Sequence, residues 1–70
     1  MILALAPLHV ELEIIKVMLE ETERKRFEKL GIKVGSKITI LDSTNGNLII
    51  FTETGRVALD KSIATKILVR

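Results

Sequence analysis

A chain of 70 residues that is 47% hydrophobic has room for one small domain and is too apolar to be disordered. It has no cysteine, which excludes disulfides, zinc–thiolate sites and iron–sulfur ligation by this chain. We therefore expect a single domain over residues 1–70. The net charge of +2 is small, and the basic residues are interspersed with acidic ones, so we expect no nucleic-acid partner.

The chain opens on the apolar run Met1–Leu8, which has no basic start and no stretch of about 20 apolar residues. We therefore expect a soluble chain in which this run adds a short strand or covers one end of the core. From Val10 to Leu19 apolar and polar residues alternate, and the alternation changes phase after Ile14. A phase change inside a strand is typical of a β-bulge, so the sequence predicts one long, bent strand.

The run Glu20–Lys29 predicts a short helix, with acidic residues at its start and basic ones towards its end. Glu21 and Lys25 stand in the favoured i,i+4 orientation for an ion pair. Only Phe27 and Leu30 offer apolar contact, so the helix is expected to cap the sheet along one thin edge.

Glycines mark the corners that follow. Gly31 stands where a helix ends in a left-handed residue, and Gly35 opens a second bend. Asn45-Gly46 between Ile40 and Leu48 is a strong hairpin signal. The remaining expected elements are strands at Lys37–Leu41, Asn47–Thr52 and Arg56–Asp60, a turn at Glu53–Gly55, a helical turn at Lys61–Thr65 and a last strand ending in Ile67–Val69.

Short strands, tight turns and one helix predict a mainly β fold. We expect a small SH3-like, partly open antiparallel barrel of about five strands with one short helix. A barrel of the OB type is the main alternative, although it usually has longer strands.

The residues offer little catalytic chemistry. His9 is the only histidine, and we interpret it as a solvated loop residue. Glu11 and Glu13 alternate with apolar neighbours, which solvent exposure explains. Glu20, Glu21 and Glu23 lack the pattern of a calcium loop. No nucleophile elbow or phosphate loop is present. We expect no enzyme, no cofactor and no metal site, and we place Phe27 and Phe51 in the core rather than on a base-stacking surface.

Several segments in this order and spacing resemble the FeoA family of ferrous iron transport accessory proteins. Gly35 lies in a corner where the family commonly has Pro-Gly, with Val34 in place of the proline. His9 likewise replaces a frequent glycine. The segments that carry the resemblance are Leu5–Leu8, Arg24–Ile32, Arg56–Asp60 and Ala64–Val69.

The resemblance implies a cytoplasmic SH3-like protein that supports a membrane ferrous iron permease with a GTPase domain, and that reaches the membrane only through this partner. It implies no catalysis and no established iron ligation. On this basis the helix and corner are the expected partner-binding surface. Arg24, Lys25 and Lys29 would steer the partner, and Leu30 and Ile32 would anchor it.

Four alternatives stay open from the sequence. The chain could be a regulatory module related to the C-terminal domain of iron-dependent repressors, although it has no helix-turn-helix, or a small-barrel nucleic-acid-binding protein. Phe27 and Leu30 could plug the end of the barrel rather than face a partner. An exposed edge strand or the Met1–Leu8 run could pair chains into a homo-oligomer.

Overall fold

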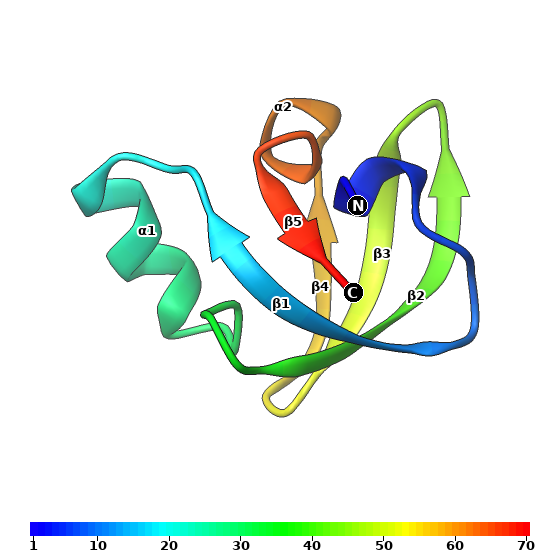
Figure 1. The fold of residues 1–70 in the computed structure, drawn as a ribbon, viewed down its shortest axis with the longest axis horizontal. Helices are drawn as coiled ribbons and strands as arrows, with labels where there is room; N and C mark the ends of the chain where they lie inside the picture. Colours follow the sequence, from blue (N-terminus) through cyan, green and yellow to red (C-terminus); the bar gives the residue numbers. More distant parts are fainter.

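A computed structural model describes all residues 1–70, and its mainly β, SH3-like architecture confirms the expected fold class (Figure 1). Five antiparallel strands form one strongly bent sheet in the order β4-β3-β2-β1-β5. The strands are β1 (Glu11–Val17), β2 (Lys37–Thr44), β3 (Asn47–Thr52), β4 (Gly55–Leu59) and β5 (Ile67–Val69). The helices are α1 (Glu21–Glu28), the one-turn α2 (Lys61–Ala64) and a 3₁₀ turn (Leu3–Leu5).

Two irregularities bend the sheet into a barrel. In β1 the register against β5 shifts between Ile14 and Lys16, which confirms the phase change read from the sequence. In β2 the register against β3 shifts between Ile40 and Asp42. Such bulges increase twist locally, so β1 can pair with β2 through its first half and with β5 through its second. Strand β1 spans Glu11–Val17 and is therefore shorter than the expected range 10–19.

The core lies between the two halves of the bent sheet and is almost wholly aliphatic. The inward residues alternate as predicted in β2, where Ile38 and Ile40 are buried, and in β3, where Leu48 and Ile50 are buried. The buried cluster comprises Leu3, Leu12, Ile14, Phe27, Ile32, Ile38, Ile40, Leu48, Ile50, Leu59, Ile63, Ala64, Ile67 and Val69.

The N-terminal run covers one end of the core, as one of the two sequence interpretations proposed. Leu3 is fully buried, and Ile2 forms a β-bridge with Leu68 of β5. His9 is exposed and takes a φ of 62°, the left-handed conformation that glycine would take there. It therefore sits in a loop, as expected.

Helix α1 lies beside the barrel rather than over an open face (Figure 1). It is one residue shorter at each end than predicted. Phe27 is its only buried residue, which confirms that the helix contacts the core along a thin edge. No helix in the structure is both long enough and apolar enough to cross a bilayer.

The corner between α1 and β2 is a tight turn over residues 33–36. The Ser36 N–H donates to the Lys33 carbonyl over 3.0 Å, and Gly35 at the third position has a φ of 92°. This is the pattern of a type II turn, which favours proline at the second position. Val34 occupies that position, is 64% exposed, and uses its N–H in no backbone hydrogen bond outside the regular elements.

We therefore expect Val34→Pro to stabilise the protein by about 0.4–1 kcal/mol, because proline restricts the unfolded chain and removes no native hydrogen bond. Urea unfolding monitored by circular dichroism measures this change. Val34→Ala serves as the control, since it removes the side chain without fixing φ. A Val34→Pro protein less stable than the Val34→Ala protein would contradict the turn assignment.

Candidate partner-binding surface

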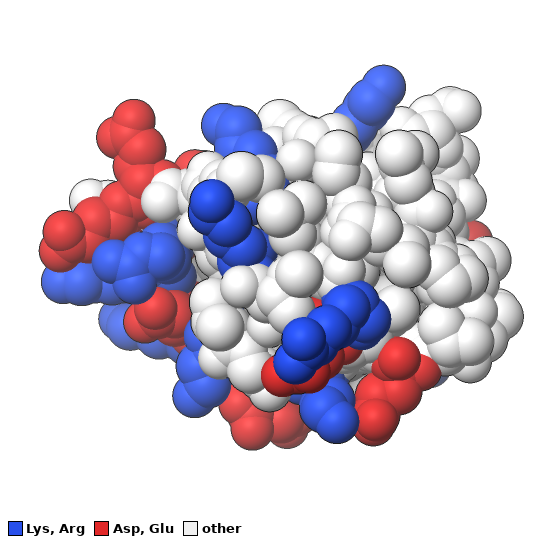
Figure 2. All heavy atoms as spheres, in the orientation of Figure 1, with Lys and Arg blue, Asp and Glu red and all other residues white.

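We use the name helix–corner surface for α1 and the segment that follows it up to Lys37. Space-filling atoms show charges of both signs crowded over α1, whereas the face over the N-terminal run is largely uncharged (Figure 2). The helix–corner surface is thus strongly charged in this view.

Most of the basic residues of α1 already have acidic partners. Arg24 pairs with Glu28 over 2.9 Å and Lys25 pairs with Glu21 over 3.2 Å, which confirms the i,i+4 pair predicted from the sequence. Arg26 contacts Glu23 more loosely, at 3.8 Å. Exposed pairs of this kind add little stability, and they neutralise much of the charge that Arg24 and Lys25 would present to a partner.

Two lysines at the end of the helix lie outside this network. Neither Lys29, the C-terminal cap residue of α1, nor Lys33 in the corner belongs to any ion pair, and both are exposed. The unpaired positive charges of the helix–corner surface therefore come from residues that precede and follow Leu30 in the chain.

Leu30 is fixed in position through its backbone. Its carbonyl oxygen accepts hydrogen bonds from the hydroxyls of Thr52 and Thr54, each over 2.8 Å. Thr52 is almost fully buried at the end of β3, so this contact connects the helix–corner surface to the barrel. The Leu30 side chain remains 36% exposed. Because two hydroxyls hold the backbone of Leu30, its side chain can contact a partner without the entropic cost of ordering a mobile loop.

The position of Ile32 contradicts its predicted role as an anchoring residue. It was expected to anchor a partner together with Leu30, but its side chain is fully buried in the aliphatic core. Gly31 between them has a φ of 86°, which turns the chain so that Leu30 faces outward and Ile32 inward. Ile32 is therefore a core residue, and the alternative of a plugged barrel end holds for Phe27, which is also buried.

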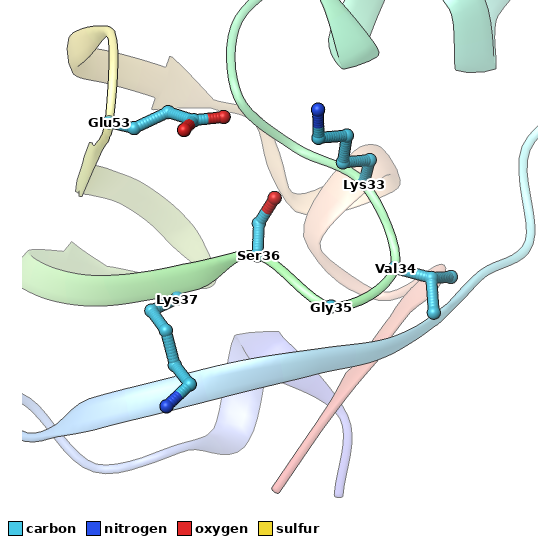
Figure 3. A pocket seen from close by; sticks show the side chains of 6 residues that line it. All are labelled: Lys33, Val34, Gly35, Ser36, Lys37 and Glu53. Atoms are coloured by element: carbon cyan, nitrogen blue, oxygen red, sulfur yellow. The ribbon is translucent and has the colours of Figure 1, made fainter.

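The corner borders a shallow hollow that is lined by residues 33–37 and Glu53 (Figure 3). The Glu53 carboxylate and the Ser36 hydroxyl point into this hollow, while Val34 points away along the outside of the corner. One carboxylate beside two lysines is a mixed polar environment. No group of three or more His, Cys, Asp or Glu side chains that could hold a metal ion occurs in the structure.

Two exposed apolar residues were missed or misplaced by the sequence analysis. Val34 is exposed in the corner, where it borders a second hollow with Val17, Arg24, Glu28 and Lys33. Phe51 was placed in the core, but it is 52% exposed on the outer face of β3 because no helix covers that face. Its charged neighbours are of both signs, namely Glu11, Lys37 and Glu53.

Comparisons with known proteins agree on one family. The model of the FeoA domain matches residues 1–70. A relative from Methanocaldococcus jannaschii, named "Putative Fe(2+) transport protein A", is 36% identical over 45 residues, which are 64% of this chain and 55% of that protein. The chain thus spans about half the length of the curated relative that it matches.

Solved structures share the fold over the whole of this chain. The FeoA protein from Chlorobium tepidum has a TM-score of 0.87 at 21% identity, and this chain covers 69% of it. A crystal structure described as an iron uptake regulatory protein (FeoA) has a TM-score of 0.89 at 21% identity, with 95% of that chain covered. Iron(II) transport protein A from Clostridium thermocellum has a TM-score of 0.88 at 19% identity, with 44% covered.

Proposed function

Since this chain belongs to the FeoA domain family, we propose that it is a cytoplasmic accessory protein of ferrous iron transport that docks on the GTP-binding part of a membrane permease. The name of the Methanocaldococcus jannaschii relative, which refers to Fe(2+) transport, supports the iron part of this proposal. The docking part rests on the residues of this chain.

The observation that carries the docking proposal is Leu30. It combines an accessible aliphatic side chain and a backbone pinned by Thr52 and Thr54. Two exposed lysines without ion pairs, Lys29 and Lys33, precede and follow it in the chain. Interfaces concentrate their binding energy in a few such anchors, and charges around them mainly speed association. Lys29 keeps the steering role proposed from the sequence. Arg24 and Lys25 contribute less because Glu28 and Glu21 neutralise them.

Leu30→Asp is expected to weaken binding to the permease by at least about 2 kcal/mol, or roughly 30-fold, because it places a carboxylate where an apolar contact forms. The fold should persist, since the two threonines bond to the backbone carbonyl rather than to the side chain. Titration of the permease's isolated cytoplasmic portion, together with uptake of radioactive Fe²⁺ in cells lacking the wild-type chain, measures the effect.

Leu5→Asp is the matched control. Leu5 is 80% exposed on the N-terminal run, far along the chain from α1, and the same substitution there should leave binding and uptake unchanged. A folded Leu30→Asp protein that binds the permease and supports uptake like the wild type would overturn docking through Leu30.

A further inference from the structure

The two edge strands of the sheet differ in whether another segment of the chain pairs with their outer side. On β5, the Met1 amine donates to the Val69 carbonyl over 2.7 Å and the Val69 N–H donates to the Met1 carbonyl over 2.8 Å, so the N-terminal run covers this edge. At the other end of the strand order, β4 pairs only with β3 (Figure 1). The outer edge of β4 is therefore the open edge of the barrel.

The hairpin geometry identifies which backbone groups lie free on that edge. A two-residue turn joins Thr52 to Gly55, and these residues form the pair that closes the hairpin. Since hydrogen-bonded pairs alternate along an antiparallel ladder, Gly55, Val57 and Leu59 bond to β3. The N–H and C=O groups of Arg56 and Ala58 then point outward. Neither residue takes part in a backbone hydrogen bond outside the regular elements.

The edge also leaves apolar surface incompletely covered. Val57 packs against the core from the inner face of β4, yet it is only partly buried. On the outer face, the exposed Ala58 stands beside Ile49 of β3 in a shallow hollow that also includes Asp60. No proline, bulge or inward-pointing charge protects this strand, although such features commonly prevent edge-to-edge pairing.

We propose that two copies of this protein associate by antiparallel pairing of β4 with β4, about a two-fold axis at Val57. In this register Arg56 of each copy faces Ala58 of the other, and the free groups of both residues form four hydrogen bonds across the axis. The two Val57 side chains meet at the axis and bury each other. This inference goes beyond the proposed function, because it concerns self-association and does not involve the helix–corner surface.

Charge complementarity favours a second copy as the occupant of this edge. Arg56 and Asp60 lie on the outer face, and neither belongs to an ion pair within one chain. In the β4 pair, Arg56 of one copy and Asp60 of the other become diagonal neighbours, within reach of a long side chain. The two-fold axis generates this contact twice, as an isologous interface requires.

The chemistry of Asp60 is compatible with this contact. Its Oδ1 accepts from the Ser62 hydroxyl over 2.6 Å and from the Ile63 N–H over 3.0 Å, which caps α2 and leaves Oδ2 without a partner. These two hydrogen bonds, with that of Ser62 the larger cause, hold the pKa of the Asp60 carboxyl below its usual value. The group therefore carries its negative charge at neutral pH.

Sedimentation equilibrium of the wild type and three variants over a wide concentration range tests the proposal. Ala58→Pro removes an N–H that points to the open edge and leaves the ladder to β3 intact, a placement that edge strands tolerate. It removes two of the four hydrogen bonds and should weaken dimerisation by about 30-fold. Arg56→Glu places a carboxylate beside Asp60 of the second copy, and the repulsion between the two negative charges should also weaken dimerisation. Val34→Pro, which introduces proline outside β4 and its open edge, is the matched control.

A wild-type dimer that Ala58→Pro and Arg56→Glu convert to monomer, with Val34→Pro still dimeric, would support the proposal. A wild type that stays monomeric throughout would overturn it, as would variants that dimerise like the wild type. Association into species larger than a dimer would indicate head-to-tail pairing and would also overturn it. If circular dichroism shows Ala58→Pro to be unfolded, Arg56→Glu alone decides, because Arg56 is exposed and makes no ion pair in the monomer.

Discussion

Gly31→Ala is expected to destabilise the protein by about 2–4 kcal/mol, the sum of backbone strain and a steric clash. Gly31 has a φ of 86°, which an alanine adopts only at a cost of about 1–2 kcal/mol. A Cβ built on Gly31 would lie 2.9 Å from the Thr52 Oγ1 and 3.1 Å from its Cβ. Thr52 cannot easily move away, because it is buried and its hydroxyl donates to the Leu30 carbonyl and accepts from the Thr54 N–H.

Gly35→Ala separates the two contributions. Gly35 has a similar φ of 92°, but a Cβ added there would meet nothing within 4 Å. It should cost only the strain of about 1–2 kcal/mol, so the difference between the two variants measures the clash with Thr52. Thermal unfolding of a domain of this size shifts by roughly 4–8 °C per kcal/mol, so the variants should be clearly resolved. Equal melting temperatures would contradict a rigid contact between the corner and β3.

Much of the barrel could be predicted because its signals are local. Asn45 and Gly46 take φ values of 53° and 84°, as the hairpin signal requires, and the two flanking strands pair across them. The phase change after Ile14 predicted the bulge in β1, since a one-residue slip moves every later side chain to the other face. These features depend on residues that are adjacent in sequence, so no tertiary information was needed.

The errors arise where the exposure of a residue depends on a distant segment. Phe51 lies opposite Leu48 and Ile50 in the alternation of β3, so its outward direction was readable. Whether anything covers that face depends on where α1 packs, and the charged sequence of α1 does not encode this. The contact of Thr52 with the Leu30 carbonyl joins residues 22 positions apart and was equally unreadable.

The assignment of Ile32 failed for a different reason. Leu30 and Ile32 are two residues apart, and in an extended chain such residues share a face. The left-handed conformation of Gly31 breaks this rule by turning the chain between them. The glycine was recognised in the sequence as a corner, but the direction in which the chain leaves that corner depends on its packing against Thr52 and Glu53, which are distant in sequence.

Ile32→Ala is expected to destabilise the protein by about 2–5 kcal/mol, because it opens a cavity among fully buried aliphatic side chains. Leu30→Ala is the natural partner variant. With 36% of its surface exposed, Leu30 contributes less to the core, and its loss should cost only about 1 kcal/mol. Urea unfolding of both proteins under the same conditions provides the comparison.

The two variants also distinguish folding from docking. If the chain docks on a permease as proposed, Ile32→Ala should reduce that binding only as far as it unfolds the chain. Binding should then recover when the temperature is lowered into the range where the variant is folded. Leu30→Ala should weaken binding while the chain stays folded. If Ile32→Ala proved as stable as the wild type, the turn at Gly31 would not direct this side chain into the core. The assignment of Leu30 as the anchoring residue and Ile32 as the core residue would then be wrong.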